Sequence, residues 1–269
     1  MKAIVAYDGT LDAKDALKYA IRKVCEKGGE IVTLCAFDRD LFVTYDAVPR
    51  VEDVARRDAE RYIEEARSLL RQCRDMVKAY IVEVDGNPER ETISLAKSEN
   101  ADIIFVPRRY RAVQKKAKCP VVVIPGTLLV PVDHTTSDVV NLDQLIQEAQ
   151  ATRSTVVLLG LVPEHLYNST ERAELDRIMV QTQVTVKSLA SLLAKNGIKS
   201  QETIRSGYPD EEILRVAEDR AVSMIVFLKG NHKSAELTKA ETIITDDSAK
   251  VRVPVFSVLA RWQPGFLSS

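Results

Sequence analysis

The sequence predicts an α/β protein made of two tandem domains, each containing a doubly wound parallel sheet. The first observation behind this prediction is an internal repeat, in which Ile4–Thr10 returns as Leu129–Thr135. The offset between the copies is that of a whole domain and is far too long for a solenoid repeat. The second observation is that short apolar runs alternate with longer amphipathic stretches, a pattern typical of parallel strands covered by helices on both faces. We place the domains at residues 1–126 and 127–269.

Two more pairs of landmarks recur in the same order. The Gly-Asn-Pro sequence at 86–88 returns as Gly-Tyr-Pro at 207–209, and Cys-Pro-Val at 119–121 returns as Val-Pro-Val at 253–255. Several aligned landmarks in one order are difficult to explain by chance. The repeat therefore covers almost the whole chain.

Hydrophobic spacing predicts the elements of the first half in order. An apolar run at 3–7 indicates a strand, and residues 12–26 carry apolar side chains at helical spacing until the glycine pair at 28–29 ends the helix. The segment 107–120 is expected to be a loop. By the same arguments, further strands are expected at 31–36, 78–84, 103–106 and 121–124, and further helices at 52–74 and 89–99.

The second half repeats this plan. Only Pro125 and Gly126 separate the last strand of the first half from the first strand of the second, and so short a linker is expected to keep the domains in contact. Strands are expected at 127–132, 155–161, 199–205, 223–228 and 254–259, and helices near 138–150, 171–195 and 210–219.

Composition narrows the classes of function. The 269 residues are 45% hydrophobic and 29% charged with a formal net charge of -1, which favours a folded protein and gives no overall basic field for nucleic acid. No apolar run approaches the roughly 18 residues of a membrane span, and the first residues reach Asp8 too early for a signal peptide. We therefore expect a cytoplasmic protein with neither nucleic acid nor membrane as its partner.

The reactive residue types do not form a recognisable catalytic or metal-binding pattern. The cysteines lie far apart without a Cys-x-x-Cys pair, and the histidines are equally scattered, so we expect reduced thiols and no metal site. The motifs of serine hydrolases and of P-loop nucleotide-binding proteins are also missing. We therefore do not expect an enzyme.

Polar and small residues follow the ends of several predicted strands. Asp8-Gly9-Thr10, Gly86 and the segment after Val106 all stand at such ends in the first half. In doubly wound sheets, ligands bind in the crevice at the carboxyl ends of the strands, near the switch in strand order. We therefore expect these residues to converge on one crevice, with a counterpart in the second half.

These motifs resemble the universal stress protein family, once in each half. A first strand that ends in Asp-Gly-Thr is similar to the family's usual Asp-Gly-Ser. The Gly-x-Pro turn after the third strand and the Cys-Pro-Val-Val-Val-Ile sequence at 119–124 are further matches. The resemblance implies a Rossmann-like fold in each half. It also implies that the final strands, 121–124 and 255–259, pair so that the halves form an intrachain pseudo-dimer, because an edge strand must be covered.

Members of the family that bind nucleotides carry Gly-x-x-Gly, nine residues, and then Gly-Ser or Gly-Thr before the last strand. Glycines allow backbone N–H groups to approach phosphate oxygens, and the hydroxyl adds a donor. The first half has no glycine between 107 and 120. In the second half Leu228, Asn231 and Glu241 stand where glycines are expected, followed by Thr242. Glu241 would repel phosphate, since two unit charges about 4 Å apart interact by roughly 4 kcal/mol at an effective dielectric constant near 20.

The resemblance implies a set of ligand-contacting positions in the two halves. For Asp8 and Asp133, contact with a ribose or an adenine is one interpretation, and capping of the following helix or turn is the other. Gly86 and Gly207 fit the geometry of a turn. The candidate positions are Asp8, Gly9, Thr10, Ala36, Gly86, Val106, Arg108 and Arg109 in the first half, and Asp133, Thr135, Gly207, Gly230 and Thr242 in the second.

The segment that replaces the phosphate loop in the first half is strongly basic. Six of the eleven residues from 108 to 118 are arginine or lysine. One interpretation is that these cations hold an anionic ligand at the crevice by charge instead of by backbone amides. The other is a solvated basic loop.

The function expected from the sequence is that of a stress-response or regulatory protein that acts through protein interaction, without strong ATP binding and without a cofactor. The partners would be an unidentified protein and self, through the pseudo-dimer or a homodimer. The alternative is a sensor of adenine nucleotides, with ATP and Mg as cofactor and slow hydrolysis, in which Arg108, Arg109 and Arg111 or Gly230 and Thr242 hold the phosphates. A soluble regulator of a membrane transporter is a third alternative, implied only by relatives of the family that are fused to transporters.

Overall fold

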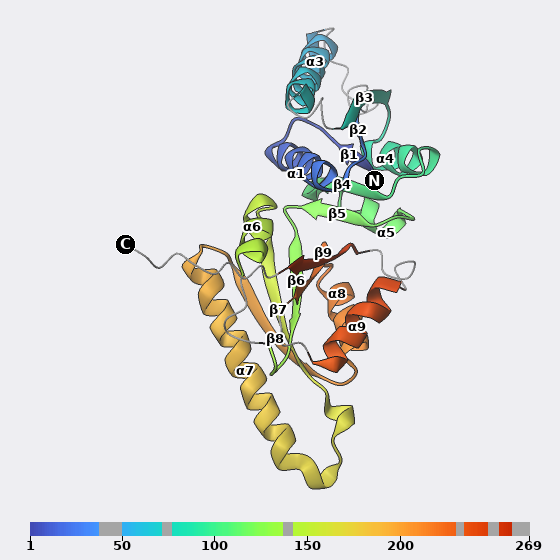
Figure 1. Cartoon of the computed structure of the whole chain (residues 1–269). Coiled ribbons are helices and arrows are strands. Elements are labelled where there is room, and N and C mark those ends of the chain that lie inside the picture. Colours follow the sequence, from blue (N-terminus) through green and yellow to red (C-terminus); the bar gives the residue numbers. More distant parts are fainter. Residues whose placement is uncertain (38–49, 72–76, 137–141, 230–233, 247–252, 260–269) are drawn as a thin grey trace. The chain divides into compact units, whose positions relative to one another are not determined.

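The computed structural model describes residues 1–37, 50–71, 77–136, 142–229, 234–246 and 253–259. The chain divides into two compact units, Met1–Gly126 and Thr127–Ser269 (Figure 1). Each unit is described by itself below.

Unit 1 is built on a parallel sheet of five strands. The strand order is β3-β2-β1-β4-β5, so the chain winds outward from β1 in one direction and then continues on the other side of it. The register pairs Ala3 with Ile31 on one side and with Ile103 on the other. The strands are β1 (Lys2–Ala6), β2 (Glu30–Phe37), β3 (Lys78–Asp85), β4 (Ile103–Pro107) and β5 (Val121–Ile124).

Helices cover both faces of this sheet. Helix α1 (Leu11–Lys27) packs on β1 and β4 beside α3 (Arg50–Arg71), whereas α4 (Pro88–Ser98) packs on β1 and β2 beside α5 (Val113–Lys116). A short 3-10 helix, η1 (Arg108–Tyr110), follows β4 directly. The central strands are continuous apolar runs because both of their faces are buried, and every residue of β4 and β5 is buried.

Unit 2 repeats this topology. Its parallel sheet has the order β10-β9-β6-β7-β8, which is the order of unit 1 element for element. Leu128 pairs with Val156 and with Met224, so the central strand has the same two neighbours as in unit 1. The strands are β6 (Thr127–Val132), β7 (Thr155–Val162), β8 (Ser200–Ser206), β9 (Met224–Lys229) and β10 (Val255–Leu259).

The helices of unit 2 also lie on both faces. The long helix α7 (Arg172–Lys195) runs along β7 and β8 (Figure 1), and α6 (Asp143–Ala151) contacts β10. Helices α8 (Pro209–Asp219) and α9 (Ala235–Asp246) pack together and share one apolar core with Leu129, Val157 and Phe227 of the sheet. Two short 3-10 helices, η2 (Glu164–Leu166) and η3 (Ser169–Glu171), connect β7 to α7.

The predicted fold class is confirmed, and each predicted strand is present within two residues of its expected bounds. Five helical elements differ from the expectation, including η2 and η3 between β7 and α7. The segment after β4 contains η1 and α5 instead of a loop, because Tyr110, Val113 and Ala117 bury one side of it. Helix α9 occupies a region that aligns with the family's phosphate loop. Its helical character comes from the spacing of the buried residues Leu237, Ala240 and Ile244. The described part of the chain contains no helix that is long and apolar enough to cross a membrane.

The contact between β7 and α7 depends on a glycine in the strand. A Cβ atom built on Gly160 would lie 2.9 Å from Cγ2 of Thr182 and 3.0 Å from Cγ2 of Val186. Both side chains are buried, with exposed fractions of 0% and 1%, so neither can move into solvent. The close approach of α7 to the sheet therefore requires the absence of a side chain at this position.

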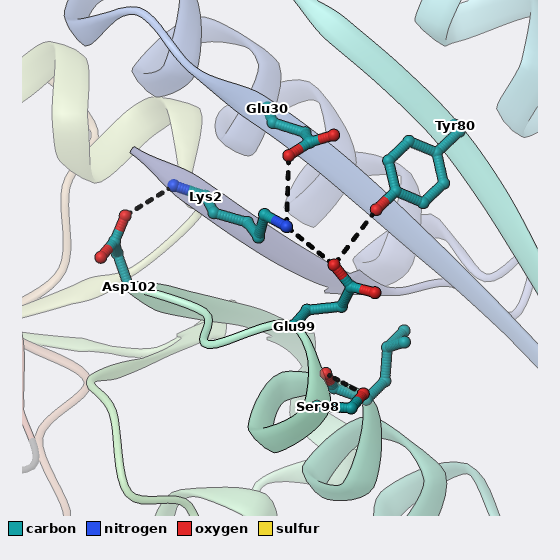
Figure 2. A network of polar contacts seen from close by, with 7 residues as sticks. Lys2, Glu30, Tyr80, Ser98, Glu99 and Asp102 are labelled. Atoms are coloured by element: carbon teal, nitrogen blue, oxygen red, sulfur yellow. Dashed lines mark hydrogen bonds and ion pairs between the residues drawn. The ribbon is translucent and has the colours of Figure 1, made fainter.

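A polar network joins four segments at the amino-terminal end of the unit 1 sheet (Figure 2). The Lys2 ammonium donates to Glu99 at 2.7 Å and lies 3.3 Å from Glu30. The backbone N–H of Lys2 donates to Asp102 at 2.7 Å, and the Tyr80 hydroxyl donates to Glu99 at 3.4 Å. The hydrogen bond from Lys2, together with its charge, holds the pKa of Glu99 below its ordinary value of 4.5.

We predict that Gly160→Ala lowers the free energy of unfolding by about 1–3 kcal/mol, because the added methyl group overpacks a buried interface. Adding Thr182→Ser to the Gly160→Ala variant should restore part of the lost stability. The serine lacks the methyl group at 2.9 Å and keeps the hydroxyl. Urea denaturation of both variants measures this. If the double variant is no more stable than Gly160→Ala alone, the packing argument is contradicted.

We predict that Lys2→Gln lowers the melting temperature at neutral pH and has no effect in acid. The pKa of Glu99 is depressed in the folded state, so its ion pair stabilises the fold above pH 4.5 and this contribution is lost as the pH falls below that value. The effect is small because solvent screens the pair. Melting curves between neutral and acidic pH measure it, with the exposed Lys18→Gln as the control for net charge. A difference between the two variants that persists in acid would contradict the assignment to Glu99.

Candidate functional site

The strand order locates the candidate crevice of each unit. In unit 1 the winding direction changes between β1 and β4, and in unit 2 between β6 and β9. Ligands of doubly wound sheets bind at the carboxyl ends of the strands at this switch. The residues after β1 and β4 are Tyr7–Thr10 and Arg108–Tyr110, and their side chains meet as the sequence predicts.

Asp8 and Thr10 are engaged in starting helix α1. The backbone N–H and the hydroxyl of Thr10 both donate to Oδ1 of Asp8, the N–H at 3.0 Å. Thr10 is the N-cap residue, and its Oγ1 accepts from the backbone N–H of Ala13 at 3.3 Å. This is the capping arrangement that was one of the two interpretations of the motif.

Gly9 lies directly beneath an aromatic side chain from α3. Its φ of 75° belongs to the left-handed region, and a Cβ atom built on it would lie 2.6 Å from Cβ of Tyr62. The Tyr62 ring also packs against Tyr7, with a distance of 6.3 Å between the ring centroids. The space above the glycine is thus occupied by the protein's own side chain.

The segment after β4 supplies the counter-ion of Asp8. Nη1 of Arg109 lies 3.3 Å from Oδ2 of Asp8, and its guanidinium lies 5.0 Å from the ring centre of Tyr110. Tyr110 is buried, and burial followed by the negative charge of Asp8 raises the pKa of its phenol. The charge of Asp8 is therefore compensated within unit 1.

The other predicted positions of unit 1 form hydrogen bonds within the protein or are buried in its strands. Nε of Arg108 donates to the carbonyl oxygen of Pro125 at 3.0 Å. Ala36 and Val106 are buried in β2 and β4, with exposed fractions of 7% and 0%. Gly86 has a φ of 149° and donates its N–H to the carbonyl oxygen of Phe37, as expected of a turn.

The carboxylate of Asp133 in unit 2 accepts hydrogen bonds at both of its oxygens. Its side chain is 2% exposed, and Oδ1 accepts from the N–H and hydroxyl of Thr135 at 2.9 and 2.7 Å. The N–H and hydroxyl of Thr136 donate to the same oxygen at 3.1 and 3.2 Å. Oδ2 accepts a hydrogen bond from the hydroxyl of Ser234. Both carboxylate oxygens of Asp133 therefore have donors within unit 2.

Helix α9 begins earlier than a phosphate loop of family length would allow. Ser234 precedes its first turn, and Oγ of Ser234 accepts from the N–H of Leu237 at 3.0 Å. Thr242 is exposed on the helix, and its hydroxyl donates to the carbonyl oxygen of Thr238 at 3.1 Å. The hydroxyl at the start of the helix thus belongs to Ser234, and it donates to Asp133. Gly230 lies outside the described residues.

A histidine that sequence reasoning did not select joins three segments at this end of unit 2. Nδ1 of His165 lies 3.2 Å from the carbonyl oxygen of Gly207, and its Nε2 lies 3.3 Å from Oε2 of Glu236 on α9. Its ring stacks on Tyr208, with centroids 4.2 Å apart. A lone histidine after a strand gives no signal of these contacts in the sequence, whereas the aligned Gly-x-Pro turn does place Gly207 and Tyr208 at this edge.

The protonation of the buried groups in unit 1 does not favour nucleophilic chemistry. Burial, followed by the charge of Glu83, raises the pKa of the Cys35 thiol to about 12. Burial likewise raises the pKa of Tyr62 to about 12. A thiol with so high a pKa is protonated at neutral pH and is a poor nucleophile. Within the described ranges no three acidic, histidine or cysteine side chains gather in the arrangement of a metal site.

A pocket of about 300 Å³ lies elsewhere, between α3 and the edge strand β3 of unit 1. None of the predicted site residues lines it. Two of its arginines, Arg67 and Arg71, already form ion pairs with Glu64 on the same helix. Its lining residues are Arg67, Leu70, Arg71, Ala79, Tyr80 and Ile81.

Solved structures of low sequence identity resemble the chain. A universal stress protein from Archaeoglobus fulgidus is 16% identical, with 95% of each chain covered and a TM-score of 0.41. A protein of the same family from Burkholderia pseudomallei is 23% identical over 46% of this chain and 95% of its own, with a TM-score of 0.38. A family protein from Arabidopsis thaliana, solved with AMP bound, is 12% identical over 50% of this chain and 91% of its own, with a TM-score of 0.36.

A comparison with curated proteins gave no match. The assignment to a family rests instead on the sequence model of the universal stress protein family, which matches the chain twice, at residues 1–125 and 126–239. The first match covers the sheet of unit 1, and the second covers the sheet of unit 2 except for β10. The chain belongs to the universal stress protein family and carries two tandem copies of its domain.

Proposed function

We propose that this tandem universal stress protein is a regulatory protein of the stress response that acts by binding other proteins, without strong ATP binding in either half. Membership of the family supports the link to stress. The observation that carries the rest of the proposal is that the aspartate at the end of the first strand of each unit has internal partners. Asp8 pairs with Arg109, and Asp133 accepts from Ser234.

The packing above Gly9 supports this proposal for unit 1. A ligand ring or ribose placed at the end of β1 would have to displace Tyr62, whose Cβ leaves no space even for a methyl group on Gly9. It would also break the ion pair between Arg109 and Asp8. Both costs would have to be recovered by contacts with the ligand, and unit 1 lacks the glycines that bring backbone amides to phosphates.

The start of α9 supports the proposal for unit 2. A helix N-terminus is a good anion site when its N–H groups are free to point at the ligand. Here Ser234 caps the helix and donates to Asp133, which places a carboxylate beside the helix start. A phosphate would meet that negative charge, and such a pair of like charges is unfavourable.

A sensor of ATP and Mg with a diverged site is the second candidate. The observation that favours it is the exposure of the Arg109 side chain, which is 59% although its guanidinium pairs with Asp8. An anion could compete for this guanidinium from solvent. Slow hydrolysis would also require a side chain that activates the attacking water.

We also propose that the two halves pair through their final strands, or pair with those of a second copy as a homodimer. Strands β5 and β10 each stand last in the strand order of their own sheet. Such an edge carries unpaired N–H and carbonyl groups and is normally covered. A cytoplasmic location and an unidentified protein partner complete the proposal.

We predict that calorimetric titration with Mg-ATP gives no saturable binding and that ATP leaves the melting temperature unchanged. The physical reason is that both carboxylates at the crevices are already compensated. A ligand at 100 times its dissociation constant would stabilise the fold by about 2.7 kcal/mol, so the melting curve is a sensitive measure. Saturable heat together with a thermal shift, or ATP in the extract of the purified protein, would favour the sensor instead.

We predict that Ser234→Ala lowers the free energy of unfolding by about 1–3 kcal/mol, because it removes a helix cap and one donor to a buried carboxylate. Thr242→Ala on the same helix is the matched control, since its hydroxyl is exposed and donates only to its own helix, and its effect should stay within about 0.5 kcal/mol. Urea denaturation compares the two. Equal effects, or a larger one at Thr242, would show that the family alignment of the loop describes unit 2 better than the capped helix does.

A further inference from the structure

The segment after β4 presents a cluster of positive charge of which only Arg109 pairs with Asp8 in the crevice. The elements η1 and α5 bring six basic side chains to the surface of unit 1 within eleven residues, and we call this surface the basic cap. Its exposed members are Arg108, Arg109, Arg111, Lys115, Lys116 and Lys118. Asp102 is the only acidic residue between 101 and 126, and it is engaged by the backbone N–H of Lys2.

The basic cap is a fixed element of the fold. Tyr110, Val113 and Ala117 are 7%, 0% and 2% exposed, and they belong to the apolar core that includes Ile4 and Val106 of the sheet. These three residues anchor the segment along its length, so the cations between them stand at defined positions. A binding partner would not have to order a flexible loop, and the entropic cost of binding is correspondingly lower.

The cations of the basic cap divide into two groups. Arg108 is held by the Pro125 carbonyl and Arg109 by Asp8, and Lys115 also has an interaction within the chain. By contrast, no acidic side chain in the described part of the chain forms an ion pair with Arg111, Lys116 or Lys118. Several cations on one anchored surface, without counter-ions among the described residues, create a local positive potential, although the chain as a whole has a net charge of -1.

We propose that the basic cap is the docking surface for an acidic segment of a partner protein. This inference rests on the proposed function and names the kind of partner that it requires. Arginine and lysine donate charge-assisted hydrogen bonds to carboxylates, and each exposed pair is weak alone. A chain that carries several carboxylates can engage Arg111, Lys116 and Lys118 together, which a single small anion cannot.

The surroundings of the cations favour a protein over the two other polyanions. Single-stranded nucleic acid is bound by basic surfaces that also offer exposed aromatic rings for stacking, and the one aromatic residue of the cap, Tyr110, is buried. Segments that bind membranes insert apolar side chains beside their charges. The apolar residues of the cap face the core instead. What remains at the surface is charge and hydrogen-bond donors, which match an acidic peptide.

The test is fluorescence anisotropy of a labelled glutamate-rich peptide titrated with the full chain. The variant Arg111→Gln, Lys116→Gln, Lys118→Gln removes the three cations without counter-ions and leaves the groups bound to Asp8 and Pro125 in place. We expect it to weaken binding roughly tenfold. The matched control is Lys18→Gln, Lys187→Gln, Lys195→Gln, which changes the net charge equally at exposed positions on α1 and α7 and should weaken binding by less than about twofold.

The outcomes separate this inference from the alternatives. No binding of the peptide by the native chain, or equal weakening in variant and control, overturns it. Tighter binding of single-stranded RNA or of anionic phosphatidylserine vesicles through the same three cations also overturns it, because the partner would then be a nucleic acid or a membrane. Melting curves of both variants establish that they are folded. Saturable Mg-ATP binding by calorimetry would contradict the proposed function. It would not decide whether the basic cap binds an acidic peptide, which the anisotropy titration tests independently.

Discussion

The structure of each crevice depends on the need to compensate a carboxylate at the end of the first strand. Asp8 and Asp133 stand where the parallel sheets reverse their winding direction, and there the strand ends direct side chains into a partly dry space. A buried charge without partners is strongly destabilising. This aspartate must therefore find its partners either in a bound ligand or in donors of the protein itself. Which of the two supplies them determines whether the crevice can bind a ligand.

The two units satisfy the same need in different ways. Unit 1 uses charge, because Arg109 from the segment after β4 approaches Asp8, and Tyr62 from α3 covers the adjacent glycine. Unit 2 uses neutral donors, because two threonines bond one oxygen and Ser234 at the start of α9 bonds the other. In both units one of these partners, Arg109 or Ser234, comes from the segment after the fourth strand of the unit. This is the segment in which nucleotide-binding members of the family carry their glycines.

The sheets could be predicted from the sequence because their signal is local. Val121–Ile124 is a continuous apolar run, and the alternation of such runs with amphipathic helices leaves few topologies. The interpretation of Asp8 as part of a helix cap was also available from the short spacing to Thr10. The side chains that fill the crevices could not be predicted from local sequence, because Tyr62 lies 53 residues from Gly9 and Ser234 lies 101 residues from Asp133. Thr242 matches the hydroxyl position of a phosphate loop by alignment, whereas the buried spacing of Leu237, Ala240 and Ile244 places it on a helix.

The segment after β4 in unit 1 contains no glycine and forms η1 and α5. A phosphate loop keeps its donors directed into the crevice, whereas the anchored turn of η1 and α5 directs only Arg109 inward. Its apolar residues are used for packing, so the remaining cations have to face solvent. Closing the crevice and exposing a basic surface are thus two results of one change in the chain.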